Sequence, residues 1–342
     1  MKKVFLIVLM IVLFVVGGIL IYFGLFKKAE PEEISIGATI TLKRELKIVD
    51  EDSTSRPYAV MINNHSKART NHAGLQDAYI VYEAIVEGGL TRMMAIYKDK
   101  DTARIGSVRS SRHYFLDYAL ENDAIYVHFG WSPQAQSDIR KLGINNINGL
   151  YDSPFWRDYS LGVPLEHTAF TNMEKIKEYS LKKGYRTTSD KELLLNYNPE
   201  EVNINEKEGA IVANQIDIRY SYYVTSSYAY DSQNKVYLRS VNGTPHMTSD
   251  ANKVKTQVSA KNIIIADMSN YSIDSYGRQN LNNIGEGNGY YITNGYAVPI
   301  KWIKTSRDSQ TIYQYLDGTE IEVNDGNTFI QLRPINQNLN IS

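Results

Sequence analysis

The sequence predicts an α+β fold in three parts: an N-terminal transmembrane helix, an α/β domain and a β-rich C-terminal domain. Three observations lead to this prediction. Residues 4–26 form one long apolar run, helical and strand-like patterns alternate over residues 56–200, and helical periodicity is absent beyond about residue 205. A chain of 342 residues has room for an anchor and two ordinary domains. The expected boundaries are 1–28 for a transmembrane signal-anchor, 29–55 for a tether, 56–200 for the α/β domain and 201–342 for the β-rich domain.

The apolar run at residues 4–26 is interrupted only by three glycines. As a helix it would be roughly 34 Å long, enough to cross a hydrocarbon core of about 30 Å. It leads directly into Lys27 and Lys28, without the small-x-small cleavage site of a secretory signal peptide. We therefore expect an uncleaved single-pass anchor in the cell membrane, with the bulk of the chain extracytoplasmic. Lysine pairs flank both ends, so the positive-inside rule gives the orientation little support.

Charge and cysteine content exclude several classes of protein. The first 28 residues hold four of the 37 basic residues and none of the 38 acidic ones, so the rest of the chain is mildly acidic. Such a chain has no electrostatic reason to bind nucleic acid. It contains no cysteine. Disulfides, zinc-thiolate sites, a thiol nucleophile and a lipid attached to an N-terminal cysteine are therefore excluded.

The α/β domain follows a charged tether in which residues 36–48 form a possible strand. Its expected strands are residues 58–62, 80–86, 91–97 and 124–129. Residues 87–90 (Glu-Gly-Gly-Leu) join two of these strands as a hairpin turn that glycine permits. The expected helices are one capped by Ser110, one at residues 133–142 that Gly143 ends, and one at residues 172–183 that Gly184 ends.

The β-rich domain consists of short strand-like segments separated by Asn-Gly and Asp-Gly turns. The segments are residues 216–224, 235–241, 262–267, 289–293, 298–303, 311–315, 320–323 and 328–332. Residues 285–289 (Gly-Glu-Gly-Asn-Gly) are expected to form a glycine-rich turn between strands. Because this turn does not open a helix, it has little of the character of a phosphate-binding loop.

The densest polar cluster contains Arg104, Arg109, Ser110 and Arg112. If Ser110 caps a helix, Arg109 and Arg112 lie at its N-terminus, where the helix dipole already presents partial positive charge. Several cations at this end require a nearby anion. The anion is either a ligand carboxylate or phosphate bound by the arginines and backbone N–H groups, or an internal side chain such as Glu83 or Glu87.

Two other groups are candidates for chemistry. Glu87 lies at the hairpin tip, where it either acts as a general acid/base or pairs with Arg92. On a strand, Glu83 and Glu87 would be about 13 Å apart, too far for a glycosidase carboxylate pair. His65 and His128 each follow a short buried strand, His65 directly after Asn64, so they could converge at one edge of an open sheet.

No metal or cofactor is expected. The remaining histidines lack the His/Glu spacing of zinc peptidases. Neither a G-x-S-x-G elbow nor an S-x-x-K motif accompanies the serines.

Several motifs together resemble the YerB-like lipoprotein family of Gram-positive bacteria. They begin at Arg56 (RPYAVMINNH), Tyr82 (YEAIVEGGLTR), Arg104 (RIGSVRSSR), Gly243 (GTPH), Ala260 (AKN), Gly285 (GEG) and Asn327 (NTFIQLRP). The resemblance covers residues 56–334. It implies a two-domain extracytoplasmic protein of the cell envelope, and it implies no reaction. The absence of cysteine departs from the lipoprotein pattern and leads us to expect the transmembrane helix as the anchor.

The sequence leaves three hypotheses for function. The first is a membrane-anchored envelope protein that contacts the bilayer through residues 4–26 and binds peptidoglycan or another anionic wall polymer. Its expected ligand-binding residues are Asn64, His65, Arg92, Arg104, Arg109, Ser110 and Arg112. The second is a cell-wall hydrolase or lyase with Glu87 or His128 as general acid/base. The third is a scaffold for envelope protein complexes.

Overall fold

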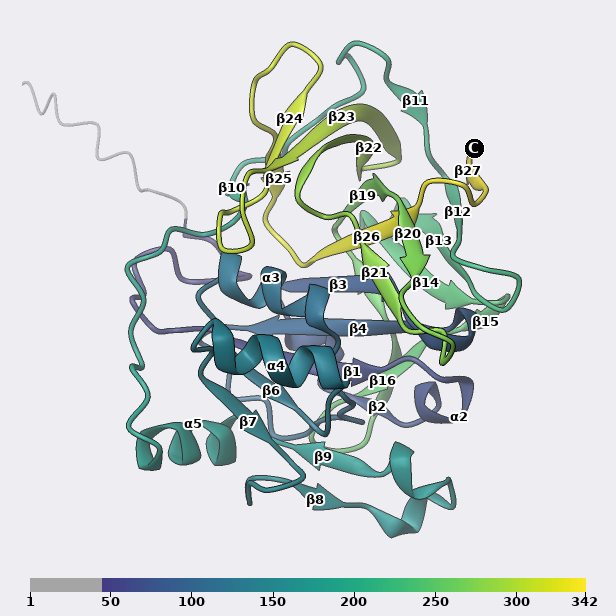
Figure 1. Ribbon diagram of the computed structural model, residues 1–342. Coiled ribbons are helices and arrows are strands. Elements are labelled where there is room, and N and C mark those ends of the chain that lie inside the picture. Colours follow the sequence, from purple (N-terminus) through teal and green to yellow (C-terminus); the bar gives the residue numbers. More distant parts are fainter. Residues whose placement is uncertain (1–44) are drawn as a thin grey trace, which may run out of the picture. The chain divides into compact units, whose positions relative to one another are not determined.

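The computed structural model describes residues 45–342 (Figure 1). The predicted transmembrane helix at residues 4–26 and most of the predicted tether lie outside this range. Within it, none of the helices combines the length and apolar character that crossing a membrane requires.

The predicted α+β class was wrong, because the protein is mostly β. Strands account for 41% of the described residues and helices for 15%. The helices of the predicted α/β domain are real but short. They are α2 (Ser66–Arg69), α3 (His113–Glu121), α4 (Pro133–Lys141) and α5 (Met173–Lys182), with the 3-10 turns η1 (Leu75–Asp77), η2 (Glu87–Gly89), η3 (Tyr159–Leu161) and η4 (Leu165–His167). The chain between them pairs into sheets.

The largest sheet of the described chain has eleven strands. They are β1 (Tyr58–Asn63), β3 (Ile80–Ile85), β4 (Thr91–Tyr97), β6 (Ile125–His128), β7 (Asn146–Asn148), β11 (Ile211–Val212), β19 (Asn262–Met268), β22 (Gly285–Thr293), β23 (Tyr296–Lys304), β24 (Ile312–Tyr315) and β26 (Thr328–Pro334). The order is β11-β23-β22-β19-β26-β3-β4-β1-β6-β7, with β24 also paired to β23. Strands β1, β3 and β4 are buried along their whole length, which explains their near-continuous apolar sequences.

This sheet runs through both predicted domains. Strand β26, from the C-terminal part of the chain, lies between β19 and β3 and pairs in parallel with both (Figure 1). Its register places Thr328 opposite Ile80 and Leu332 opposite Ala84. The predicted domain boundary at residues 200 and 201 stays a prediction.

Two further six-stranded sheets lie beside the largest one. One contains β12 (Gln215–Arg219), β13 (Thr225–Asp231), β14 (Val236–Val241), β15 (Thr244–Pro245), β18 (Ser259–Ala260) and β27 (Leu339–Ile341). The other contains β2 (His72–Ala73), β5 (Ile105–Gly106), β8 (Trp156–Arg157), β9 (Ala169–Thr171), β16 (Met247–Ser249) and β17 (Lys255–Gln257). The two-stranded pairs are β10 (Asn196–Asn198) with β25 (Glu322–Asn324) and β20 (Asn270–Ser272) with β21 (Gln279–Leu281).

Local sequence explains most of these boundaries, with two corrections. The β3–β4 hairpin turns at Gly88 and Gly89, whose φ angles of 68° and 69° are strained for other residues. Helix α3 begins later than predicted, with Arg112 as its N-cap instead of Ser110. The glycine-rich segment at residues 285–289 is the first half of strand β22 and not a turn.

Candidate functional site

Two arginines of the predicted cluster have an internal anion. Arg112 forms a bidentate pair with Glu87, with Nε 2.6 Å from Oε1 and Nη2 2.9 Å from Oε2. Arg104 pairs with Asp158 at 2.7 Å, and its guanidinium lies 3.8 Å above the centre of the Phe170 ring. For these two residues the structure therefore favours the internal alternative, with Glu87 as the partner of Arg112.

Arg92 and Arg109 have no carboxylate partner among the described residues. Arg92 is only 7% exposed, and its Nη1 donates a hydrogen bond to the backbone oxygen of Ser110. Burial, together with the charges of Arg112 and Arg109, lowers the pKa of Arg92 to about 9 against the opposing charge of Glu87. Arg109 donates to the backbone oxygen of Glu166 at 3.3 Å. Two partly desolvated cations thus lie together without a direct ion pair, although the charges of Glu87 and Glu166 act on them from nearby.

Two histidines, His65 and His167, lie beside Arg92 and Arg109. The rings of His65 and His167 stack with their centres 4.8 Å apart and their planes 16° from parallel. His65 caps α2, and its Nδ1 accepts from the backbone N–H of Lys67. Burial is the largest cause lowering the pKa of each histidine, and nearby cations add to it. Both rings are therefore mainly neutral at pH 7.

Asn63 fixes the tautomer of His167. Its Oδ1 accepts from the backbone N–H of His65 at 3.1 Å, so its amide nitrogen must face His167 Nδ1, 2.7 Å away, and donate to it. The Nδ1 atoms of His65 and His167 are therefore both acceptors. Each neutral ring consequently carries its proton on Nε2, where it can donate to a ligand.

These side chains line a cavity of about 210 Å³. Lys67, Val86, Leu90, Thr91 and Pro164 also contribute to its wall. The one carboxylate of the lining is Glu166, whose side chain is half exposed at the rim and 3.9 Å from His167 Nε2. The interior of the cavity is thus positively charged and rich in hydrogen-bond donors. It can hold a phosphate or carboxylate group.

A second network, which the sequence did not reveal, lies directly behind this cavity. Glu83 and Arg239 form an ion pair at 2.8 Å, and both side chains are completely buried. Arg239 also donates to Nδ1 of His246, whose Nε2 is 2.7 Å from Nδ1 of His72. Nε2 of His72 in turn lies 2.5 Å from the backbone oxygen of Asn63. We call Glu83, Arg239, His246 and His72 the seam network, because it joins strands from both halves of the chain.

Donors and acceptors are consistent along the seam network. Nε2 of His72 must donate to the Asn63 carbonyl, so its Nδ1 accepts from His246 Nε2, and His246 Nδ1 accepts from Arg239. Burial lowers the pKa of His72 to about 3 and lowers that of His246 strongly. Both rings therefore stay neutral, and the one buried positive charge of the network is matched by Glu83.

Besides the paired Glu87, Arg104 and Arg112, three more of the predicted site residues do not line the cavity. Asn64 belongs to the surroundings of the seam network, because its Nδ2 donates to Glu83 and to Thr91. Ser110 Oγ donates to the backbone oxygen of Phe129. His128 is completely buried, with its ring nitrogens at hydrogen-bond distance from Gly130 O and Asn146 Oδ1. Three predicted residues, His65, Arg92 and Arg109, thus line the cavity. Asn63, Lys67 and His167 line it too and were not predicted.

Neither predicted general acid/base has suitable geometry. Burial alone would raise the pKa of Glu87, but the hydrogen bonds and charge of Arg112 lower it below its ordinary value. Glu87 is therefore a paired carboxylate. His128 has no nitrogen facing the cavity, and burial lowers its pKa. In the described part of the chain no three His, Asp or Glu side chains are grouped to hold a metal ion.

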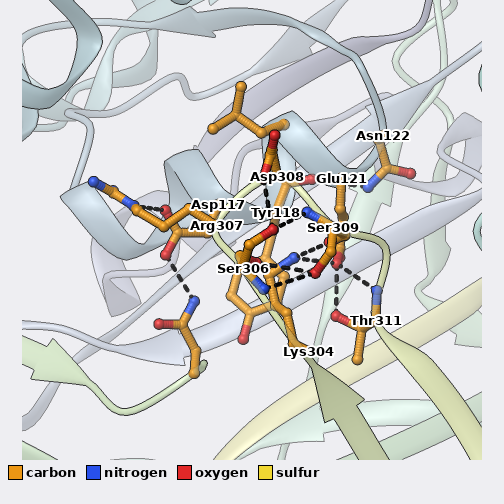
Figure 2. A network of polar contacts seen from close by, with 12 residues as sticks. Asp117, Tyr118, Glu121, Asn122, Lys304, Ser306, Arg307, Asp308, Ser309 and Thr311 are labelled. Atoms are coloured by element: carbon orange, nitrogen blue, oxygen red, sulfur yellow. Dashed lines mark hydrogen bonds and ion pairs between the residues drawn. The ribbon is translucent and has the colours of Figure 1, made fainter. Parts of the chain in front are cut away.

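Figure 2 shows a third polar cluster, in which α3 meets the loop after β23. Glu121 accepts from Lys304 Nζ at 2.9 Å, and both side chains are almost completely buried. Arg307 pairs with Asp117 at 2.6 Å and with Asp138 at 3.0 Å. Every charge at the centre of this cluster has an internal partner, so its role is to attach α3 to the C-terminal half of the chain.

Known proteins match most of the chain. The family model described as "Protein of unknown function (DUF3048) N-terminal domain" matches residues 45–186, and its C-terminal counterpart matches residues 216–330. "Putative lipoprotein YerB" of Bacillus subtilis (strain 168) is 32% identical over 300 residues, which are 86% of this chain and 84% of that protein. The crystal structure of the YerB protein from Bacillus subtilis superimposes with a TM-score of 0.74 at 29% identity, covering 87% of this chain and 99% of that one.

Proposed function

This chain belongs to the DUF3048 family, and from that premise we propose that it is an extracytoplasmic protein of the cell envelope that binds an anionic ligand. Family membership confirms the resemblance that the sequence motifs predict. The name of its Bacillus subtilis relative, a lipoprotein, supports a membrane-associated position in the envelope. The candidate ligands in that compartment are anionic groups of the cell wall.

The observation that carries the proposal is the burial of Arg92 without a carboxylate. An uncompensated buried charge costs several kcal/mol, so folding alone does not favour a guanidinium at this position. Arg109 adds a second cation to the same cavity; it donates to the backbone carbonyl of Glu166 and forms no ion pair with that residue's half-exposed carboxylate, which is nearby. An anion bound between them would neutralise both and accept from the Nε2–H groups of His65 and His167.

The geometry favours binding over catalysis. Hydrolysis of a phosphodiester places the attacking and leaving oxygens on opposite sides of phosphorus. The stacked rings of His65 and His167 lie side by side and so do not provide a base and an acid on two opposite sides. Glu87 and His128, the candidates for a hydrolase or lyase, both have internal partners.

Thermal unfolding with added anions tests the proposal. We expect orthophosphate or acetate to raise the melting temperature of the wild type, as for any ligand that binds only the folded state. The Arg109→Ala variant should lose this shift. Arg140→Gln is the matched control, because Arg140 is exposed on α4 and the variant loses the same charge away from the cavity. Absence of a shift in the wild type with both anions, or an equal shift in Arg109→Ala, would overturn the proposal.

A further inference from the structure

A second cationic cavity lies beside the first. It has a volume of about 290 Å³, and Ser66, Arg69, Thr244, Pro245, Met247 and Lys255 contribute to its wall. Arg69 Nη1 donates to the backbone oxygen of Asn64 at 2.6 Å, and Lys255 Nζ donates to that of Thr70 at 2.8 Å. Neither cation pairs with a carboxylate in the described range. No acidic side chain lines this cavity.

The two cavities are neighbours across a single turn of helix. His65 and Lys67, at the start of α2, line the first cavity, whereas Ser66 and Arg69 line the second. The width of a helix, about 10 Å with its side chains, therefore sets the separation between the two anion positions. The cations of both cavities act on His65. Beyond the effect of burial, the charges of Arg69 and Arg109 both lower its pKa.

Arginines without a carboxylate partner are concentrated here. Over residues 45–342, those that form ion pairs are Arg56, Arg104, Arg112, Arg186, Arg239, Arg278, Arg307 and Arg333. Arg69, Arg92 and Arg109 do not, although burial lowers the pKa of each. In the first two the pKa falls to about 10 and about 9. Arg140, Arg157 and Arg219 form no ion pair in this range either, so three of the six arginines without a carboxylate partner lie around α2.

We propose that the ligand is a linear polyanion, a polyol chain with phosphate groups in series, and that two phosphates of one chain occupy the two cavities. This inference rests on the proposed function and specifies its ligand. One phosphate lies against Arg92 and Arg109, and another phosphate of the same chain lies against Arg69 and Lys255 on the other side of α2.

The second cavity distinguishes a polyol chain from a plain inorganic polyphosphate. Pro245 and Met247 present apolar surface next to the Arg69 guanidinium, and this surface suits the carbon atoms of a linker. Ser66 and Thr244 add hydroxyl groups that can bond to linker oxygens. Neither cavity is lined by a phenylalanine, tyrosine or tryptophan ring, the side chains on which single-stranded nucleic acids most often stack their bases.

Calorimetric titration with sn-glycerol 3-phosphate and with short glycerol-phosphate oligomers tests the proposal on the folded protein. The oligomers should bind about tenfold or more tightly than the monomer, because the second phosphate binds at high effective concentration. Arg69→Gln should remove this excess, while binding of the monomer that depends on Arg109 persists. Arg69→Lys, which keeps the charge, should retain part of it, and Arg140→Gln should retain all of it.

The outcomes separate this inference from the proposed function. If the monomer binds and depends on Arg109 but the oligomers bind no more tightly, or if Arg69→Gln keeps the excess, only the polyanion inference fails. If neither monomer nor oligomer binds, or if Arg109→Ala changes nothing, both fail. A deoxythymidine oligomer of equal charge that binds as tightly, with the same dependence on Arg69, would overturn the assignment to a polyol chain.

Discussion

The seam network and the neighbouring cavity are built from the same kinds of side chain, arginine and histidine, on adjacent segments of chain. In the seam network, Glu83 supplies the negative charge for Arg239, and the histidines are neutral with both nitrogens in use. In the cavity, Arg92 and Arg109 have no such acid, and the histidines keep a free Nε2–H. Residue type alone therefore does not distinguish a structural arginine from a ligand-binding one. The distinction depends on whether a carboxylate of the protein forms an ion pair with it.

Asn63 belongs to both regions. Its backbone oxygen accepts from His72 in the seam network, and its side chain orients His167 in the cavity. The buried seam network thus holds the cavity in position, which is how a binding site is kept ready for its ligand.

The largest effect is expected in the seam network. Glu83→Ala leaves the Arg239 guanidinium buried without a partner, so the free energy of unfolding should fall by about 3–5 kcal/mol. Urea denaturation measures this loss. The double variant Glu83→Ala/Arg239→Met should recover a large part of it, because no charge remains buried. A loss below about 1 kcal/mol in the single variant would mean that the network contributes little to stability.

A smaller loss is expected from Arg112→Gln, which removes the partner of Glu87. Hydrogen bonds to charged groups contribute about 1.5–3 kcal/mol, and this pair is only partly buried, so a loss near the lower figure is expected at pH 7. The folded pKa of Glu87 lies below its unfolded value of 4.5, so its contribution is present above pH 4.5 and is lost as the pH falls through the folded pKa. Stability measured against pH should fall less steeply over this window in the variant.

Arg109→Ala sharpens the comparison, because Arg109 lies in the same loop as Arg112 but forms no ion pair. Its removal therefore leaves no carboxylate without its partner. Its free energy of unfolding without ligand should lie within about 0.5 kcal/mol of the wild type, while phosphate binding is lost. Parallel urea and titration measurements on Arg109→Ala and Arg112→Gln give the contrast directly. A loss of stability in Arg109→Ala as large as that in Arg112→Gln would contradict the division into arginines with and arginines without a carboxylate partner.

The smallest effect concerns pH. Burial is the largest cause lowering the pKa values of His65 and His167 in the free protein. The charges of Arg69, Lys67 and Arg109 add to it at His65, those of His65, Arg109 and Lys67 add to it at His167, and Glu166 opposes it at both. A bound anion raises these values, so binding takes up protons and affinity rises as the pH falls. We expect a few-fold tighter phosphate binding at about pH 6 than at pH 7. Titration of His65→Gln should give a weaker pH dependence, and an unchanged dependence would exclude His65 as its source.

Local sequence patterns predicted the strands and helices better than their assembly. The hairpin at residues 80–97 and the helices near residues 133 and 172 are present because glycine, proline and cap residues act over a few positions. The fold class was wrong because strand pairing between β3 and β26 depends on residues far apart in the chain, which no local pattern records.

The candidate site was predicted in part for the same reason. His65, Arg92 and Arg109 stood out as polar residues next to buried strands, and they do line one cavity. His167 and Arg239 are single residues without a surrounding motif, and only the fold brings them near His65 and Glu83. The pairing of Arg112 with Glu87 was among the alternatives, but the choice between an internal and an external anion required distances.

Strand β26 also constrains the order in which the protein folds. It fills the centre of the largest sheet, so β3 lacks a neighbour on one side until residues 328–334 have been synthesised. Contacts between such distant residues make folding slow, and a long unpaired strand edge pairs readily with other chains. We therefore expect the nascent or truncated chain to aggregate unless a chaperone covers this edge. A chain cut short before residue 328 would keep β3 as an open edge of the sheet.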